Sequence, residues 1–451
     1  MTRRRTIALL LSAALVFAGV TTACGCQREE GVSEEDAAAQ WAMGTGRLYP
    51  ETVAAPPAAP RGYVPVYISH YGRHGARYMD GKGGYEAVSD VLRQASADGM
   101  LTPLGEDIWS RYSSVLPQLL GRTGELTPLG AEQHRQIAGR MARNYPRLIG
   151  RKGAKVVANS TNLERAMLSM LSFNQALLQL NPSLDITADA SRTYMGRINQ
   201  HSPENPKVTK EDVRWKSADA PWRPGFDRYC EGLLHPETVC GAIFKDMEYL
   251  RSLCEPVLFE RKYFEVAKNL PGCPVEDCAL LRAVPSDELR LLGRLENYTF
   301  YAEKSLWLGG NGRGCYLSES VLGDIIDRVP EDIAVGVRVR LRFGHDGCIM
   351  ALFAMMGIEG WQSCFTDPSD AWQVWDTSRI PMAANFQMVF FAPGRSAKSP
   401  RPEDLLLLMM LNEEPLALPL QECAPGPFYR WSDFLEHYIP VLEEARAILA
   451  R

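Results

Sequence analysis

Several patterns that would indicate other functions are missing from this sequence of 451 residues. It contains no Cys-x-x-Cys pair and no histidine-rich run, so it offers no metal-binding pattern. No apolar run after the N-terminus is long enough to span a bilayer. The net charge is only −5, which argues against nucleic acid as a partner and against a globally basic surface. An anionic ligand would therefore need a local basic pocket.

The N-terminus has the pattern of an export signal. Three arginines precede the apolar run Ile7–Val20, which is too short to be a comfortable membrane span. Cys24 follows small residues and resembles the lipidated cysteine of a bacterial lipobox, although Thr21 stands where leucine is usual. We therefore expect a signal peptide over residues 1–23, a lipid anchor on Cys24, and a periplasmic or cell-surface location. The alternative is plain secretion.

Six of the 11 cysteines lie close together in the chain. They fall in the segment 230–315 and are Cys230, Cys240, Cys254, Cys273, Cys278 and Cys315. An exported chain can keep disulfides, and six cysteines permit 15 pairings, so disulfides in this segment are one hypothesis. The alternative is that these cysteines are free thiols, buried like small hydrophobic residues.

The stretch 64–77, VPVYISHYGRHGAR, is the most informative in the chain. Its apolar, β-rich first half predicts a buried strand over Val64–His70. Arg73, His74 and Arg77 follow on a turn that contains two glycines. A neutral imidazole can attack phosphorus, and guanidinium groups match phosphate oxygens, so the pattern indicates phosphoryl transfer. The alternative is a solvated basic loop.

A second basic residue stands at another predicted strand–helix turn. Residues 154–159 predict a buried strand, and Leu163–Leu180 predicts a strongly apolar helix. Arg165 lies in the first turn of that helix, where the helix dipole disfavours a cation unless an anion is close. A phosphate site at the helix N-terminus would explain this charge, and a surface pair with Glu164 is the alternative.

The C-terminal part repeats the same architecture. Val335–Phe343 alternates as a strand does, the turn His345-Asp346 follows directly, and residues 348–356 predict an apolar helix. The alternative for Asp346 is a simple helix cap. The pentapeptide Leu-Thr-Pro-Leu-Gly, present at 101–105 and 126–130, predicts two helix starts, because Thr before Pro suits the N-cap and N1 positions.

These elements predict an α/β protein with a central mixed, mostly parallel sheet flanked by helices. We expect the sheet domain to be formed by residues 63–184 and 331–451, with a mostly helical cap inserted at 185–330. Residues 24–62, rich in Ala, Glu and Pro, are expected to be a tether. Six basic residues in the cap alternate with acids, which is typical of a solvated face: Lys207, Lys210, Arg214, Lys216, Arg223 and Arg228.

The motif Arg-His-Gly-Ala-Arg after a strand, a later arginine and a distant His-Asp pair together resemble branch 2 of the histidine phosphatase superfamily, which includes acid phosphatases and phytases. The resemblance implies that His74 is the nucleophile and forms a phosphohistidine. It implies phosphate binding by four residues: Arg73, Arg77, Arg165 and His345. Asp346 would donate a proton to the leaving group. No metal or cofactor is implied, and the substrate would be a small phosphate ester.

Residues 71–130 resemble the multiple inositol polyphosphate phosphatases, so inositol polyphosphates such as phytate are a possible substrate class. Those enzymes usually carry His-Ala-Glu downstream, whereas this chain has His345-Asp346-Gly347, as phytases and acid phosphatases do. A phosphate beside Asp346 would raise the pKa of that carboxyl and favour activity in acid. Two alternatives remain: a non-catalytic surface lipoprotein that binds phosphorylated ligands, and a phosphomutase, against which export argues.

Overall fold

The computed structural model describes residues 34–451 except residues 82, 201, 308, 311, 364 and 424–425. The predicted signal peptide, residues 1–23, and the lipidation site Cys24 lie outside the described residues. Within this part of the chain, no helix combines the length and the apolarity that a membrane span requires.

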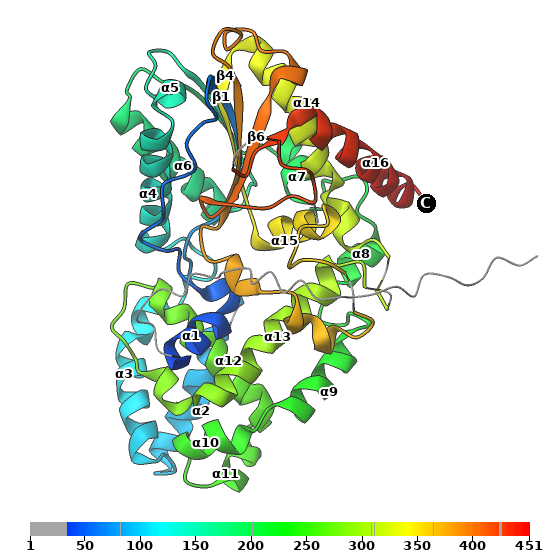
Figure 1. Ribbon diagram of the computed structural model, residues 1–451. Helices are drawn as coiled ribbons and strands as arrows, with labels where there is room; N and C mark the ends of the chain where they lie inside the picture. The colour runs from blue at the N-terminus through cyan, green and yellow to red at the C-terminus, as the bar shows by residue number, and fades with distance from the viewer. Residues whose placement is uncertain are drawn as a thin grey trace, which may run out of the picture.

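A single mixed sheet forms the upper half of the molecule (Figure 1). Its strands are β1 (Tyr63–Arg73), β2 (Lys155–Ser160), β3 (Asp185–Asp189), β4 (Val337–Gly344), β5 (Asn385–Pro393), β6 (Leu406–Leu411), β7 (Glu414–Pro415) and β8 (Tyr429–Arg430). The order is β3-β2-β4-β1-β5-β6-β7, and β8 also pairs with β6. The strands from β3 to β1 are parallel, and those from β1 onward are antiparallel. The predicted mixed α/β sheet is therefore confirmed.

Helices cover both faces of the sheet, and a separate group of helices lies beyond its lower edge (Figure 1). In chain order they are α1 (Glu34–Ala42), α2 (Gly84–Ala97), α3 (Pro103–Leu119), α4 (Pro128–Asn144), α5 (Pro146–Ile149), α6 (Glu164–Leu180), α7 (Arg192–Ile198), α8 (Lys210–Arg214), α9 (Arg223–Leu233), α10 (Pro236–Ile243), α11 (Met247–Leu253), α12 (Pro256–Asn269), α13 (Ser286–Lys304), α14 (Glu319–Val335), α15 (Asp346–Met355) and α16 (Trp431–Leu449). One face of the sheet packs against α4, α5 and α6, and the other against α14, α15 and α16.

The two copies of Leu-Thr-Pro-Leu-Gly begin α3 and α4, as predicted. The hydroxyl of Thr102 accepts a hydrogen bond from the amide of Gly105 at 3.0 Å, and Thr127 caps α4 through Gly130 at 3.1 Å. Each threonine therefore satisfies one of the backbone donors that a helix start leaves without a partner.

The boundaries of the helical cap differ from the sequence-based prediction. The core of the cap joins apolar side chains of α2 and α3 to those of residues 215–302, although 63–184 was assigned to the sheet domain. Conversely, β3 pairs with β2 and α14 packs on the sheet, although both fall partly or wholly inside 185–330. Periodicity shows that a helix has an apolar face, but it does not show which distant segment covers that face.

Residues 24–62 were predicted to be a tether. This prediction is wrong for residues 34–45, the first part of the range that the structure describes. Helix α1 packs on α13, and Ala38 and Ala42 are buried. The amide of Thr45, just beyond α1, donates to a carboxylate oxygen of Glu296 in α13 at 2.9 Å. This segment therefore belongs to the folded body, and it reaches the sheet edge described below.

All cysteines that the structure describes are free thiols, including the six between residues 230 and 315. Five of those six are buried, and Cys254 is partly exposed. The disulfide hypothesis is therefore wrong for this segment, and the alternative of buried thiols holds. In the apolar core of the cap these side chains fill space as small hydrophobic residues do.

Candidate active site

The two histidine turns meet because their strands are neighbours in register. In the parallel pair β1–β4, Arg73 lies opposite Gly344, so both strands end at the same level. The amide of His74 donates to the carbonyl of Gly344 at 3.0 Å. The rings of His74 and His345 consequently lie 5.7 Å apart between centroids. The carboxyl ends of parallel strands are where open α/β sheets usually bind ligands.

The imidazole of His74 is held as a neutral base. Its Nδ1 lies 2.9 Å from the carbonyl oxygen of Gly75, which can only accept, so Nδ1 carries the proton and Nε2 keeps its lone pair. Burial, followed by the charges of Arg73, Arg77 and Arg165, holds the pKa of His74 well below 6.5. The ring is therefore an unprotonated potential nucleophile throughout the physiological pH range.

Arg73 is fully buried and fixed by three partners. One terminal nitrogen donates to the carbonyls of Thr45, at 2.6 Å, and Ile380, at 2.9 Å. The other lies 2.8 Å from a carboxylate oxygen of Asp346. The guanidinium of Arg73 therefore joins the first predicted motif to the second, and it is anchored by the segment that was predicted to be a tether.

Asp346 is ionised in the free site. Burial alone would raise the pKa of this carboxyl, but Arg73 and the backbone amide of Gly347, which donates at 2.6 Å, lower it to about 2. The expected rise of this pKa concerned a site that holds phosphate. Without an anion beside it, the surrounding positive charge dominates.

Arg77 and Arg165 share a carboxylate that the sequence analysis did not select. Asp80 accepts from Arg165 at 3.0 Å and lies 3.9 Å from the nearest nitrogen of Arg77. Arg165 thus stands at the N-terminus of α6, as predicted, but its described charge partner is Asp80 and not Glu164. Asp80 holds two like charges together at one side of the site.

Three guanidinium donors in this site have no hydrogen-bond partner in the part of the chain that the structure describes. The Nε atoms of Arg73, Arg77 and Arg165 are buried, and none forms a hydrogen bond within the described residues. Buried donors are rarely left without a partner, because the lost hydrogen bond costs about 1–3 kcal/mol. Such a group of donors is what an anionic ligand would satisfy.

Five of the predicted site residues meet at one cavity of about 280 Å³. Its walls include His74, Arg77, Arg165, His345 and Asp346, together with residues of the cap. Buried Arg73 lines the neighbouring cavity, of about 460 Å³, and contacts Asp346 from there. The structure thus brings together the six site residues predicted in the sheet domain, whereas Cys24 lies outside the described residues. Helices α6 and α15 begin at the site, so their positive ends also favour an anion.

The remaining histidine is also neutral. Burial, followed by the charge of Arg165, lowers the pKa of His345 to about 4. Its Nε2 lies 3.3 Å from the hydroxyl of Thr161, at the end of the neighbouring strand β2. His345 can therefore donate one ring N–H to a ligand oxygen but adds no charge of its own.

The start of α4 supports the nucleophile loop, which the sequence analysis did not foresee. The amide of Ala76 donates to the side chain of Gln133 at 2.9 Å, and the carbonyl of Ala76 accepts from the amide of Thr127 at 2.9 Å. A Cβ atom on Gly130 would overlap the backbone of Ala76, and one on Gly75 would overlap Gly130. The second Leu-Thr-Pro-Leu-Gly copy therefore allows helix and loop to touch. Only its repetition in the sequence hinted at this role.

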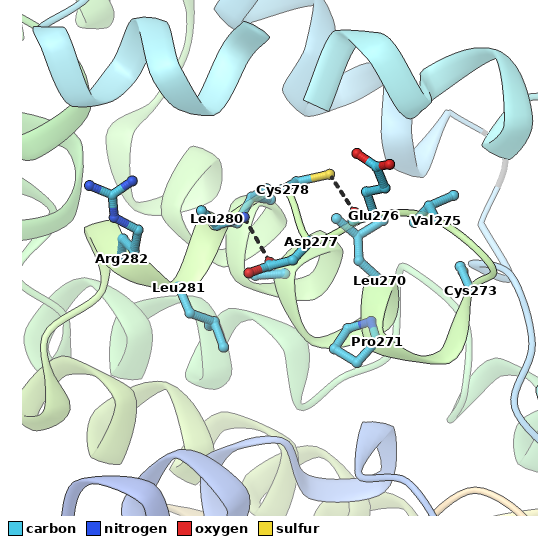
Figure 2. A pocket seen from close by; sticks show the side chains of 12 residues that line it. Leu270, Pro271, Cys273, Val275, Glu276, Asp277, Cys278, Leu280, Leu281 and Arg282 are labelled. Carbon is cyan, nitrogen blue, oxygen red and sulfur yellow. Dashed lines mark hydrogen bonds between the residues drawn. The ribbon is translucent and has the colours of Figure 1, made fainter. Parts of the chain in front are cut away.

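A separate cavity of about 360 Å³ lies inside the cap (Figure 2). Its walls come from residues 267–282, and its single arginine, Arg282, pairs with Asp107 at 2.7 Å. Its described lining contains no histidine, whereas the cavity at the sheet edge contains two. Among the described residues, no group of three or more His, Cys, Asp or Glu side chains is arranged to hold a metal ion. The absence of a cofactor stays a prediction.

Residues 72–217 match the family model of the histidine phosphatase superfamily, branch 2. This part of the chain is similar to that superfamily. The matched part runs from the residue before Arg73 into the cap and includes the loop of His74 and the turn of Arg165. The resemblance inferred from the motifs is therefore confirmed. No curated protein matches the chain.

Solved structures share the whole fold. The multiple inositol polyphosphate phosphatase of Bifidobacterium longum, in complex with inositol hexasulfate, is 16% identical with a TM-score of 0.71, and the match covers 88% of this chain and 96% of that one. A phytase from D. castellii is 13% identical with a TM-score of 0.65, covering 90% and 85%. A Hafnia alvei phytase in complex with tartrate is 13% identical with a TM-score of 0.52, covering 86% and 98%. At these identities the likeness establishes the fold.

Proposed function

We propose that this protein is an exported phosphomonoesterase that hydrolyses small phosphate esters through a phosphohistidine on His74. One observation carries the proposal: a neutral histidine lies at the carboxyl ends of the parallel strands together with three arginines whose Nε donors have no hydrogen-bond partner among the described residues. Phosphoryl transfer needs this combination of a nucleophile and fixed positive charge around the equatorial oxygens.

In the first step, Nε2 of His74 attacks phosphorus, and the bond from phosphorus to the ester oxygen breaks. Asp346 gives its proton to that oxygen, which leaves as an alcohol. Arg73, Arg77, Arg165 and His345 bind the three oxygens of the phosphoryl group. In the second step, Asp346 takes a proton from water, the water oxygen attacks phosphorus, and the bond to His74 breaks. The products are the alcohol, inorganic phosphate and the original enzyme.

Inositol polyphosphates, phytate included, are the substrate class we propose. The support is the sequence resemblance over residues 71–130 and the shared fold, together with the basic cavity walls described above. The His345-Asp346-Gly347 turn differs from the His-Ala-Glu of multiple inositol polyphosphate phosphatases, so the position of the first phosphate removed is left open.

The test is release of inorganic phosphate from phytate and from nitrophenyl phosphate near pH 5, with EDTA present. His74→Ala should abolish release from both, whereas His437→Ala, an exposed histidine on α16, should not change it. Retained activity in a folded His74→Ala variant would remove His74 from the nucleophile role. Binding without phosphate release in the wild type would favour the non-catalytic alternative, and an isomerised substrate would favour the mutase.

Export through a lipid anchor is a separate part of the proposal, supported by the N-terminal sequence alone. Cys24→Ser should move the protein from the membrane fraction to the soluble exported fraction, because the acylated sulfur is lost. Membrane association that survives this change would contradict lipidation at Cys24.

A further inference from the structure

The direction of the reaction places the leaving group against the cap. A phosphoryl group attacked by His74 expels its leaving oxygen on the opposite side, and the proton for that oxygen comes from Asp346. The residue after Asp346, Gly347, is covered by the side chain of Lys304, the last residue of α13. The group that leaves must therefore lie along the wall to which Lys304 belongs.

Lys304 occupies space that a side chain at position 347 would need. A Cβ atom on Gly347 would lie 2.7 Å from Cε of Lys304, so the glycine makes room for this lysine. Lys304 is buried, and its ammonium lies 3.2 Å from a carboxylate oxygen of Glu303. The structure thus places a cation directly beside position 347.

A second lysine stands on the same wall. Lys216 lies in the turn after α8, and the indole of the preceding Trp215 donates to the carbonyl of Ala302 at 2.8 Å, which fixes the turn to α13. Lys216 and Lys304 both line the cavity that contains His74 and Asp346. Lys216 forms no ion pair with a carboxylate of the described residues, and Glu303, the carboxylate beside Lys304, also lies 4.0 Å from Arg223.

The electrostatics agree with an excess of positive charge at this wall. Removal of its ammonium from water, followed by repulsion from Lys304, lowers the pKa of Lys216 to about 8, although the residue as a whole remains exposed. The lysines of the neighbouring cavity differ. Lys262 lies 2.9 Å from Glu265, and Lys268 lies 3.6 Å from Glu296, so each has its own carboxylate.

We propose that Lys216 and Lys304 form a second anion subsite that binds a phosphate group carried by the leaving group, next to the ester that is cleaved. The inference rests on the proposed function for the direction of attack. It specifies the substrate class further: esters with at least two neighbouring phosphates bind better than esters with one. Lys216 is one of the six cap cations that were predicted to form a solvated face. In the structure it lines the cavity that contains His74 and Asp346.

Equilibrium binding tests the subsite without requiring turnover. The probes are inositol hexasulfate, a polyanion, and inorganic phosphate, which has a single anionic group. Calorimetry on the full chain should show that Lys216→Met and Lys304→Met each raise the Kd of inositol hexasulfate about tenfold, as expected for one lost charge-assisted contact. The Kd of inorganic phosphate should rise no more than about twofold. Lys262→Met is the matched control and should change neither value.

Two outcomes would overturn the subsite. If both probes bind more weakly by the same factor, the lysines act only through the overall electrostatic potential of the site or through folding. If inositol hexasulfate binds folded Lys216→Met as tightly as wild type, Lys216 does not contact the ligand. Lys216 is exposed, so its replacement tests the idea even if Lys304→Met does not fold. Hydrolysis of nitrophenyl phosphate by the wild type is measured in parallel, because failure there rejects the proposed function and leaves the binding result standing.

Discussion

Asp346→Asn should separate substrates by their leaving groups. The substitution preserves shape but removes the proton that Asp346 is proposed to give to the ester oxygen. Alkyl alcohols leave poorly as alkoxides, whereas nitrophenolate leaves without help. We therefore expect kcat/KM for an alkyl phosphate to fall by about 10²–10⁴-fold, the usual contribution of a general acid, and that for nitrophenyl phosphate by about tenfold or less.

The structure determines how far a bound substrate must raise the pKa of Asp346 before this carboxyl can act as an acid. With a pKa of about 2 in the free site, Asp346 is protonated in only about one molecule in a thousand at pH 5. Raising that pKa to about 5 requires about 4 kcal/mol, since one pKa unit corresponds to about 1.4 kcal/mol. A phosphate dianion that binds beside Asp346 and draws on the charge of Arg73 supplies repulsion of this sign.

Binding of inorganic phosphate near pH 5 should therefore be accompanied by proton uptake. The assay is calorimetry in two buffers with different heats of ionisation, which gives the number of protons taken up. Wild type should take up a substantial fraction of one proton more than Asp346→Asn does. Equal uptake by both proteins, or equal losses of kcat/KM for the two ester types, would refute the assignment of Asp346 as the acid.

Two further predictions concern packing and pH. Gly130→Ala should lower kcat more than about tenfold, because the new methyl group overlaps the loop that carries His74, whereas Gly105→Ala, which overlaps the carbonyl of Ile243 in the cap, should lower Tm with little effect on kcat. In the cap, burial and then neighbouring Glu288 raise the pKa of Glu260 to about 8. A raised pKa means that the folded state prefers the protonated acid, so stability is greatest below about pH 4.5 and is lost as pH rises through 8. Glu260→Gln should therefore gain on the order of 5 °C in Tm over wild type at pH 8 and little at pH 5. A gain that is the same at both pH values would contradict this account.

The parts of the site that lie close together in sequence could be predicted. A strand followed at once by Arg73 and His74, and another followed by His345 and Asp346, sufficed to place both turns at a sheet edge. Parallel pairing in register then brought them within contact distance. Such local patterns are sufficient to place a residue, because a residue that directly follows a strand must lie at the end of that strand.

Partners from distant segments could not be predicted. The alternation of Val335–Phe343 located a strand, but its arginines proved to be buried: Arg340 is held by Asp332 at 2.6 Å and Arg342 by Asp324 at 2.7 Å. Both aspartates come from α14, most of which was assigned to the cap. A charged residue can be buried only with a partner, and the choice of partner depends on the tertiary fold.

The charge balance of the site bears on which substrates it can favour. Two carboxylates already accompany the arginines proposed to bind phosphate: Asp346 contacts Arg73, and Asp80 contacts Arg165. A single phosphate must therefore compete with fixed internal anions for part of its binding energy. At the cap wall, Lys216 forms no ion pair with a carboxylate of the described residues, so a second phosphate bound by Lys216 would displace no such partner. If the proposed function holds, discrimination between monoesters and polyphosphates should therefore depend more on the cap wall than on the arginines proposed to hold the reacting group.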